Sequence, residues 1–305
     1  MQHAQPSFSI IIPTYNRPRE LATCLTALTR LNYRRDCFEV IVVDDGSAVL
    51  PEAVVAPFHN QLNICLLQQS NTGPSAARNT GAAQAKGQIL AFTDDDCAPA
   101  PEWLQTLAAR FATAPDPVIV GGRTLNALSD NLYATASQLI VEVGYIYHNA
   151  DPNRARFFTS NNLALPTDRF HALGKFDTTF GTAASEDREL CGRWLHHGYR
   201  MIYAPEAMVY HAHTLTWRTF WRQHFNYGCG AFRLQQVRLR DGWQLFTPDP
   251  RYYLRLLRYP FTQIRSPQAL ILASLLFVSQ TASAVGMVSE WAQQRRKKTI
   301  VSGEV

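Results

Sequence analysis

Four short apolar runs, separated by helix-like segments, dominate the first 120 residues of this 305-residue chain. The runs are nearly continuous rather than alternating, which is typical of strands buried on both faces of a sheet. They are FSIIIP (8–13), FEVIVVDD (38–45), NICLLQQS (63–70) and GQILAFTD (87–94), and helical patterns lie between them at 17–31, 51–59 and 74–87. Such a series predicts an α/β fold, with a mostly parallel sheet and helices on both of its faces.

Polar groups follow three of these strands. They read TYNR, DDGS and TDDDC, and they should converge on one crevice because ligands bind at the carboxyl ends of strands in sheets of this kind. Neighbouring carboxylates repel one another, so the run Asp94 to Asp96 favours a bound cation or hydrogen-bond donors over a plain solvated turn. The sequence contains neither GxGxxG nor GxxxxGK[ST], which argues against an ordinary dinucleotide site or a P-loop.

Composition restricts the class of protein and its compartment. The chain is 46% apolar and 17% charged, which suits a full globular core with a second, smaller unit. Its six cysteines are scattered without a CxxC pair, and the first residues lack a signal-peptide pattern, so we expect a cytoplasmic protein with reduced thiols. Cys97, beside the aspartates, is more typical of a buried filler than of a metal ligand, because no second cysteine is near it.

Six motifs occur in a fixed order between Phe8 and His211. They are IIPTYNR, VIVVDDGS, NTGPSAARNTG, LAFTDDDC, GKFDTTF and SEDRELCGRW. Together they resemble an inverting family 2 glycosyltransferase of the DxD type, which has the GT-A fold. The resemblance implies a nucleotide-sugar-binding half at 1–122 and an acceptor-binding and catalytic half at 123–213. Residues 214–305 lie beyond it and are expected, from their own composition, to form a basic helical region.

The resemblance also implies a donor site in the first half. Tyr15 would pack on the nucleobase, Asp45 would bind the uracil edge, and Asp94 or Asp95 would touch the ribose. The full set expected to contact the donor is Pro13, Thr14, Tyr15, Arg17, Asp45, Arg78, Asp94 and Asp95. Alternatives stay open, since Tyr15 is also explained as an ordinary strand-end aromatic, and Arg78 as a partner of Asp44 or Asp45. Asp44 itself is explained equally well as a turn cap through Ser47.

A divalent cation, Mg²⁺ or Mn²⁺, is expected at Asp96. It would neutralise the charge that a nucleotide-diphosphate leaving group builds as the sugar departs. His211 resembles the histidine that completes the metal shell in some family members, and His213 stands two residues away on the same strand face. The sequence does not decide which of the two histidines binds the metal, and a structural role for either is equally open.

The expected catalytic half contains a strand at 157–166, a short helix at 167–177 and a helix from Ser185 to about His197, closed by Gly198. Glu186 and Asp187 would stabilise the start of the last helix as acidic residues in its first turn. By resemblance Asp187 is the general base that takes the proton of the acceptor hydroxyl, with Glu186 as the second candidate. Asn162 and Trp194 are expected to face the acceptor, although Asn162 is also explained by a turn hydrogen bond.

The last 92 residues differ in charge from the rest. Residues 214–305 hold 13 Lys and Arg against 4 Asp and Glu, a net charge of +9, whereas residues 1–213 carry −4. Two basic helices are expected at 216–240 and 251–265, followed by the uncharged segment 266–289 and then RRKK. The uncharged segment is long enough to span a bilayer, but its polar residues leave a buried or interfacial helix open.

These features predict a transferase at the cytosolic face of a membrane. Its donor would be a nucleotide-diphosphate sugar, UDP-sugar foremost, and its acceptor a glycan or lipid-linked glycan, with anionic lipid rather than nucleic acid beside the tail. Two alternatives are weighed against it. A sugar nucleotidyltransferase should carry a glycine-rich basic loop after the first strand, and a non-catalytic sugar or nucleic-acid binder would not need both the acid triplet and the Glu186–Asp187 pair.

Overall fold

The computed structural model describes residues 5–114, 116–244, 247, 249–265 and 267–302. The chain divides into two compact units, each described here by itself. The first comprises Met1–Ala127, His148–Gly181 and Asp187–His213, and the second comprises Leu128–Tyr147, Thr182–Glu186 and Thr214–Val305.

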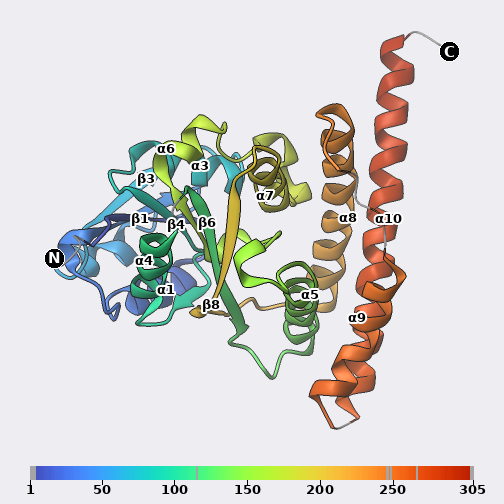
Figure 1. Ribbon diagram of the computed structural model, residues 1–305, viewed down its shortest axis with the longest axis horizontal. Helices are drawn as coiled ribbons and strands as arrows, with labels where there is room; N and C mark the ends of the chain where they lie inside the picture. Colours follow the sequence, from blue (N-terminus) through green and yellow to red (C-terminus); the bar gives the residue numbers. More distant parts are fainter. Residues whose placement is uncertain (1–4, 115, 245–246, 248, 266, 303–305) are drawn as a thin grey trace. The chain divides into compact units, whose positions relative to one another are not determined.

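The first unit is built on an eight-stranded mixed sheet with the order β3-β2-β1-β4-β7-β6-β8-β5 (Figure 1). Its strands are β1 (Phe8–Thr14), β2 (Phe38–Asp44), β3 (Ile64–Gln68), β4 (Ile89–Phe92), β5 (Cys97–Pro99), β6 (Val118–Asn126), β7 (Leu163–Pro166) and β8 (Arg200–His211). β3, β2, β1 and β4 are parallel, as the sequence predicts, and β6 is parallel to β8. β7 runs antiparallel to both β4 and β6, and β5 runs antiparallel to β8.

The helices of the first unit cover both faces of this sheet (Figure 1). They are α1 (Pro18–Leu28), α2 (Glu52–Val55), α3 (Pro74–Gln84), α4 (Trp103–Thr113), α6 (Thr167–Ala172) and α7, whose bounds are Glu186–His196. Short 3₁₀ turns occur along the chain at Arg35–Cys37, Ala56–Phe58, Pro152–Arg154, Ser160–Asn162 and Thr178–Ala183.

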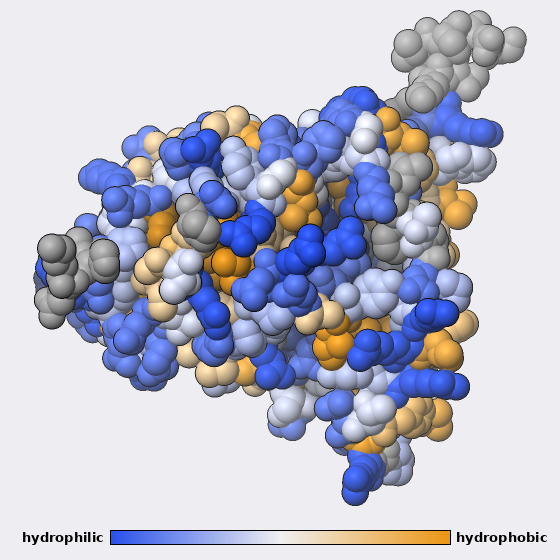
Figure 2. Space-filling view, viewed as in Figure 1, coloured by the Kyte–Doolittle hydropathy of each residue, from blue (hydrophilic) through white to orange (hydrophobic). Residues whose placement is uncertain are grey.

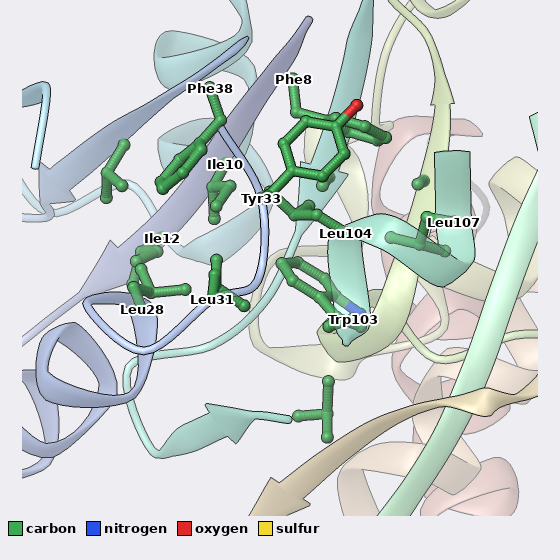
Figure 3. Packing of buried hydrophobic residues seen from close by; sticks show 14 of the residues in the cluster. Phe8, Ile10, Ile12, Leu28, Leu31, Tyr33, Phe38, Trp103, Leu104 and Leu107 are labelled. Carbon is green, nitrogen blue, oxygen red and sulfur yellow. The ribbon is translucent and has the colours of Figure 1, made fainter. Parts of the chain in front are cut away.

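Alternation along β1 sends its side chains to two cores. Phe8, Ile10 and Ile12 pack with α1 and α4 on one face, where Trp103 and Leu28 fill the layer between sheet and helices (Figure 3). On the other face α3 approaches so closely that a Cβ at Gly81 would lie 2.6 Å from the Cγ2 atom of Ile11. Both faces of β1 are therefore buried away from water, which explains its continuous apolar run.

The register of the parallel strands brings their carboxyl ends to one edge. Phe8 lies opposite Phe38 and Ile89, so β1, β2 and β4 begin at the same level. Thr14 at the end of β1 pairs with Asp44 at the end of β2. The loops after these strands consequently leave the sheet side by side.

Several sequence predictions need correction. The strand expected at 157–166 is confined to β7, because Ser160–Asn162 form a 3₁₀ turn whose polar side chains are buried and bonded. The run at 63–70 was expected to be a strand buried on both faces, but β3 is an edge strand and is only half-buried. The segment 51–59 is a one-turn helix followed by a 3₁₀ turn, and β6 runs across the expected boundary at 122/123.

The helix carrying the acidic pair matches its predicted limits to within a residue. α7 begins at Glu186 and ends at His196, and Gly198 follows with a φ of +80°. A positive φ is unfavourable for other residues, so glycine ends the helix here.

The second unit is helical. It contains α5 (Leu132–His148), α8 (Trp217–Arg240), α9 (Pro250–Gln263) and α10 (Gln268–Ser302). A shared apolar core includes Leu139 from α5, Phe220 from α8, Leu256 from α9 and Leu276 from α10. The basic helices expected at 216–240 and 251–265 are thus present. Residues 268–289 of the uncharged segment lie in α10, which continues into the basic end. The side chains of Lys297 and Lys298 fall outside the described part.

Candidate active site at the carboxyl ends of the strands

The loops that follow β1 and β2 are bonded to each other. The backbone N–H of Asn16 donates to the hydroxyl of Ser47 at 2.8 Å, and the N–H of Ala48 donates to Oδ1 of Asn16 at 2.9 Å. Asn16 has a φ of +55°, a conformation that asparagine adopts more readily than most residues. The predicted convergence of the TYNR and DDGS loops is confirmed.

The residues at the end of β1 divide into buried and exposed ones. Pro13 and Thr14 are buried, and the Thr14 hydroxyl donates to Oδ2 of Asp95 at 2.7 Å, which joins the first loop to the acid triplet. Tyr15 is 48% exposed, so its ring is available to a planar ligand. The Thr14 side chain is therefore held inside the protein by Asp95, whereas the Tyr15 ring is open to solvent.

Asp44 and Asp45 organise backbone N–H groups. Asp44 accepts from the N–H of Ser47 at 3.2 and 3.3 Å, the turn-capping arrangement expected as its alternative role. Asp45 accepts from the N–H groups of Thr72 and Gly73, both at 2.9 Å, and from the side-chain amide of Gln69 at 2.8 Å. Asp45 thereby fixes the loop before α3.

Arg17 binds two members of the acid triplet. Its Nη1 atom lies 3.1 Å from Oδ1 of Asp95 and 2.9 Å from Oδ2 of Asp96. Both carboxylates are buried, whereas the arginine side chain is partly exposed. One guanidinium nitrogen thus balances two acids whose mutual repulsion would otherwise be costly.

Arg78 pairs with the third member of the triplet. Its Nη2 atom lies 2.7 Å from Oδ1 of Asp94, and its guanidinium carbon lies 5.7 Å from the ring centre of Phe176. The sequence interpretation allowed a pairing with Asp44 or Asp45, and the structure gives Asp94 in their place. Arg78 is buried, so it supports the triplet from beneath.

His211 enters the site from the end of β8, where it pairs with Cys97 of β5. Its Nε2 atom lies 3.1 Å from Oδ1 of Asp96, and the N–H of Ala212 donates to the carbonyl of Asp96 at 2.8 Å. The ring of His213 lies 5.2 Å from that of His211 between centroids. Residues more than a hundred positions apart therefore meet at one carboxylate.

The buried charges shift the pKa values of these groups in different directions. Burial raises the pKa of Asp95 to about 6, against the opposing charge of Arg17. Burial also opposes ionisation of Asp96, but the hydrogen bond and charge of His211, together with Arg17, lower the pKa of Asp96 below its usual range. Asp96 consequently stays ionised at neutral pH.

The two histidines also differ. Burial opposes protonation of His211, but the hydrogen bond and charge of Asp96 outweigh it and raise the pKa of His211 above its ordinary 6.5. Burial and the charge of His211 lower the pKa of His213 to about 4, so His213 is neutral at neutral pH. His211 behaves as the counter-ion of Asp96, and His213 as its uncharged neighbour.

The donor atoms around Asp96 fit a divalent cation. Asp96, Cys97 and His211 each present one atom within 4.8 Å of the others, in a group found among the described residues. A carboxylate oxygen and an imidazole nitrogen suit Mn²⁺ or a similar ion. Burial raises the pKa of the Cys97 thiol well above its usual value, which keeps it protonated and argues against a thiolate ligand.

The acidic pair lies at the start of α7. Asp187 is half-buried, and its Oδ1 atom accepts from the N–H of Arg188 at 2.7 Å, whereas Glu186 is buried. The two preceding residues, Ala184 and Ser185, both have positive φ angles, at 58° and 83°. Of the two acids, Asp187 is the more accessible to solvent.

Asn162 and Trp194 are not brought to the surface of the site. Asn162 is fully buried: its amide accepts from Nε1 of Trp103 at 2.9 Å and donates to the carbonyl oxygens of Ala207 and Arg123 at 2.9 and 3.1 Å. Trp194 is also fully buried, and its Nε1 donates to the carbonyl of Arg200 at 2.8 Å. The expectation of acceptor contact needs this correction, because both polar groups are already bonded inside the protein.

The chain is similar to proteins that transfer sugars. The sequence model of the family described as Glycosyl transferase family 2 matches residues 9–177. Glycosyltransferase AglE of Haloferax volcanii is 40% identical over 268 residues, which cover 83% of this chain and 86% of AglE. Chondroitin synthase of Escherichia coli is 31% identical over 67% of this chain, but the match spans only 34% of that longer protein.

Solved structures share the fold. A mannosyltransferase from Pyrobaculum calidifontis, PcManGT, solved in complex with GDP-Man and Mn²⁺, superposes with a TM-score of 0.66 at 18% identity, covering 94% of this chain and 88% of that one. TarS 1-349 of S. aureus in complex with UDP-GlcNAc superposes with a TM-score of 0.54 at 16% identity, covering 95% and 92%. At these identities the likeness concerns the fold alone, which is the GT-A fold.

Proposed function

This chain belongs to glycosyl transferase family 2, and we propose that it moves a sugar from a nucleotide-diphosphate donor to a glycan or lipid-linked acceptor by a single, inverting displacement. The observation that carries the proposal is the meeting of three strand-end loops and β8 around Asp96. Membership of the family makes the chain a glycosyltransferase, so the nucleotidyltransferase and non-catalytic alternatives lose their support.

The donor would lie over the ends of β1, β2 and β4. Tyr15 offers an exposed ring for the base, and Arg17 and Arg78 offer positive charge beside Asp94 to Asp96. UDP-sugars are the expected donors. Because structural neighbours were solved with GDP-Man and with UDP-GlcNAc, both nucleotides belong in a donor screen.

Asp96 and His211 would hold a divalent ion, Mg²⁺ or Mn²⁺. Such an ion, when bound, neutralises negative charge on a diphosphate leaving group. The protein's own contribution is to keep Asp96 ionised through His211 and Arg17, and to exclude water by burying Asp95 and Asp96.

Asp187 would act as the general base. It is the accessible member of the acidic pair, and the start of α7 holds it in place through the Arg188 N–H. Its task would be to accept the proton of the acceptor hydroxyl as that oxygen attacks the anomeric carbon from the face opposite the diphosphate. Glu186, being buried, is the weaker candidate.

The acceptor is proposed to be presented at a membrane. One helix among the described residues, at Gln268–Arg296, is long and apolar enough to cross a bilayer. The net charge of +9 in residues 214–305 adds attraction to anionic lipid. We place the enzyme at the cytosolic face, peripheral to the membrane or anchored in it.

Two measurements test the proposal. Calorimetric screening of UDP- and GDP-sugars, with and without Mn²⁺, should find a donor whose binding requires the metal and is lost in Asp96→Ala. With that donor, Asp187→Asn should bind normally and turn over about a hundredfold to ten-thousandfold more slowly, the usual contribution of a positioned base. Metal-independent binding in Asp96→Ala, or full turnover in Asp187→Asn, would contradict the corresponding assignment.

A further inference from the structure

Helix α10 has one face packed inside the second unit. Leu272, Leu276, Ser279, Ala282 and Glu290 are all buried, and they recur at helical spacing along one side. The amino-terminal part of this face joins the apolar core shared with α5, α8 and α9. This side of α10 is therefore already covered by protein.

Contact between α8 and α10 is close enough to fix them as a pair. A Cβ at Gly228 of α8 would lie 1.9 Å from the carbonyl oxygen of Ser283, and a Cβ at Gly286 would lie 2.0 Å from that of Phe225. The hydroxyl of Ser283 donates to the carbonyl of His224 at 3.0 Å. Farther along, Nε of Arg233 lies 2.9 Å from Oε1 of Glu290.

The opposite face of α10 is apolar and exposed. Leu270 is 65% exposed, and Phe277 and Val288 are each 63% exposed. Val285 and Trp291 add further exposed apolar surface, so the stripe from Leu270 to Trp291 is about 32 Å long at 1.5 Å per residue. Figure 2 shows hydrophobic side chains reaching the surface along α9 and α10.

Basic residues accompany this stripe. α9 exposes Leu254 and Phe261 among three exposed arginines, Arg251, Arg255 and Arg258. At the far end of α10, the guanidinium carbon of Arg295 lies 4.4 Å from the ring centre of Trp291. An apolar stripe flanked by cations is the pattern of helices that lie in the interface of an anionic membrane.

We propose that the outer faces of α9 and α10 form a one-sided docking surface that lies flat in one leaflet of an anionic membrane, and that α10 does not cross the bilayer. The inference rests on the proposed membrane contact and specifies its mode. A crossing α10 would take α8 with it, because the two helices are packed together along their lengths. α8 carries five arginines, and charged side chains in hydrocarbon are costly.

Charge also favours lipid over a second copy of the chain. Pairing two stripes about a twofold axis would place the basic end of each α10 near the basic α9 of its partner. Like charges would then meet in the interface. Anionic headgroups complement the same residues.

The first experiment measures sedimentation with phosphatidylcholine vesicles, with and without phosphatidylglycerol. The full chain should sediment with the anionic vesicles, and Phe277→Glu/Val288→Glu should lower the partition coefficient by about tenfold or more. Val49→Glu/Leu50→Glu adds the same two charges at exposed positions of the first unit and should bind as the wild type does. Thr281→Glu, also exposed on α10, replaces the double variant if that one unfolds.

The second experiment distinguishes one leaflet from two. Gln268→Cys and Gln293→Cys place thiols near the two ends of the stripe, each in a Cys65→Ser background that removes the exposed native thiol. With protein added to preformed vesicles, a membrane-impermeant maleimide should label both variants fully before detergent is added. If either thiol is labelled only after detergent, α10 crosses the bilayer and the proposal is wrong.

The outcomes separate this inference from the proposed function. Donor binding with Mn²⁺ should be unchanged in Phe277→Glu/Val288→Glu, since these positions lie on the outer face of α10. A wild-type chain that binds donor but no vesicles overturns the docking surface alone, and one that binds vesicles but no donor contradicts the proposed function alone. Failure of vesicle binding together with a dimer that the double variant dissociates would identify a second copy as the occupant.

Discussion

Arg17 holds a position that a cation would share. Its guanidinium contacts both Asp95 and Asp96, so it balances the buried acids when no other cation is bound. The divalent ion that we propose at Asp96 would have to compete with this contact. The same residue that stabilises the metal-free site should therefore weaken its affinity for metal.

Replacing Arg17 tests this competition. Arg17→Gln should bind Mn²⁺ more tightly than the wild type in the absence of donor, because the carboxylate of Asp96 is released and the local negative charge increases. Isothermal titration with Mn²⁺ alone measures the difference, and Arg17→Lys, which keeps the charge, should lie between the two. Weaker binding in Arg17→Gln would show that the arginine positions the ligands and does not compete with the ion.

The ion pair of His211 and Asp96 predicts a pH dependence. Asp96 raises the pKa of His211 above 6.5, and only the neutral imidazole can bind a metal. Mn²⁺ affinity should therefore fall as pH decreases through this raised pKa, by up to about tenfold per pH unit below it for one displaced proton. His211→Gln should bind Mn²⁺ more weakly and with little change between pH 8 and pH 6, and an equally steep profile in that variant would assign the proton elsewhere.

At the scale of elements, glycines decide where two helices can touch. Gly228 and Gly286 bring the backbones of α8 and α10 together, whereas Gly144 of α5 has nothing within 4 Å of its would-be Cβ. Gly228, which has a contact partner, and Gly144, which has none within 4 Å of its Cβ position, therefore form a matched pair of helical glycines in one unit.

Gly228→Ala should destabilise the protein by about 1–3 kcal/mol, because its methyl group cannot fit against Ser283 without separating the helices. Gly144→Ala should be neutral or stabilising by up to about 1 kcal/mol, since alanine favours a helix and the space is open. Chemical denaturation measures both free energies of unfolding. Equal effects would mean that α8 and α10 are not tightly packed.

Asn162 forms hydrogen bonds to three elements of the first unit. It links Trp103 of α4 to backbone carbonyls of β6 and β8, and it is fully buried. Asn162→Leu should lower the free energy of unfolding by about 2–4 kcal/mol, because buried donors and acceptors lose their partners. The KM for acceptor, measured on folded protein, should not change; a selective rise in that KM at unchanged stability would restore the acceptor role.

The sequence predicted the positions of strands and helices better than the contacts between individual side chains. β1, β2 and β4, with α1 and α3, could be located because continuous apolar runs and helical spacing are local signals. Asn162 and Trp194 were misplaced because their sequence neighbours do not reveal that Trp103, Ala207 or Arg200 would bind them. Asp44, by contrast, was given its correct alternative, since a turn cap depends on a residue only three positions away.

For the whole molecule, the main feature is the separation of charge. Residues 1–213 carry −4 and residues 214–305 carry +9, although the total is only +5. The sequence showed this asymmetry and the apolar segment beside it. The sequence could not distinguish a membrane-spanning α10 from an α10 that lies flat on a membrane. The distinction depends on α8, which covers one face of α10 only in the folded unit.

Salt should separate the two contributions to vesicle binding. Raising the salt concentration from about 0.05 M to about 0.5 M should weaken binding of the full chain several-fold without abolishing it, since screening removes the arginine attraction but not the apolar contact. Sedimentation at each salt concentration measures the bound fraction, and Phe277→Glu/Val288→Glu should be released completely at high salt. Complete release of the wild type at high salt would show that vesicle binding is electrostatic alone and that the apolar stripe does not contribute to it.

The order of the strands also determines which parts of the sheet can form first during translation. Asp94 to Asp96 connect β4, near the middle of the sheet, to β5, which has a place only beside β8. After Asp96 leaves the ribosome, 115 more residues have to emerge before its partner His211 does. At about 5–20 residues per second this gap lasts on the order of ten seconds. A nascent chain can therefore pair β1 with β2 and β4 early, but the proposed metal site between Asp96 and His211 cannot form until translation has passed β8.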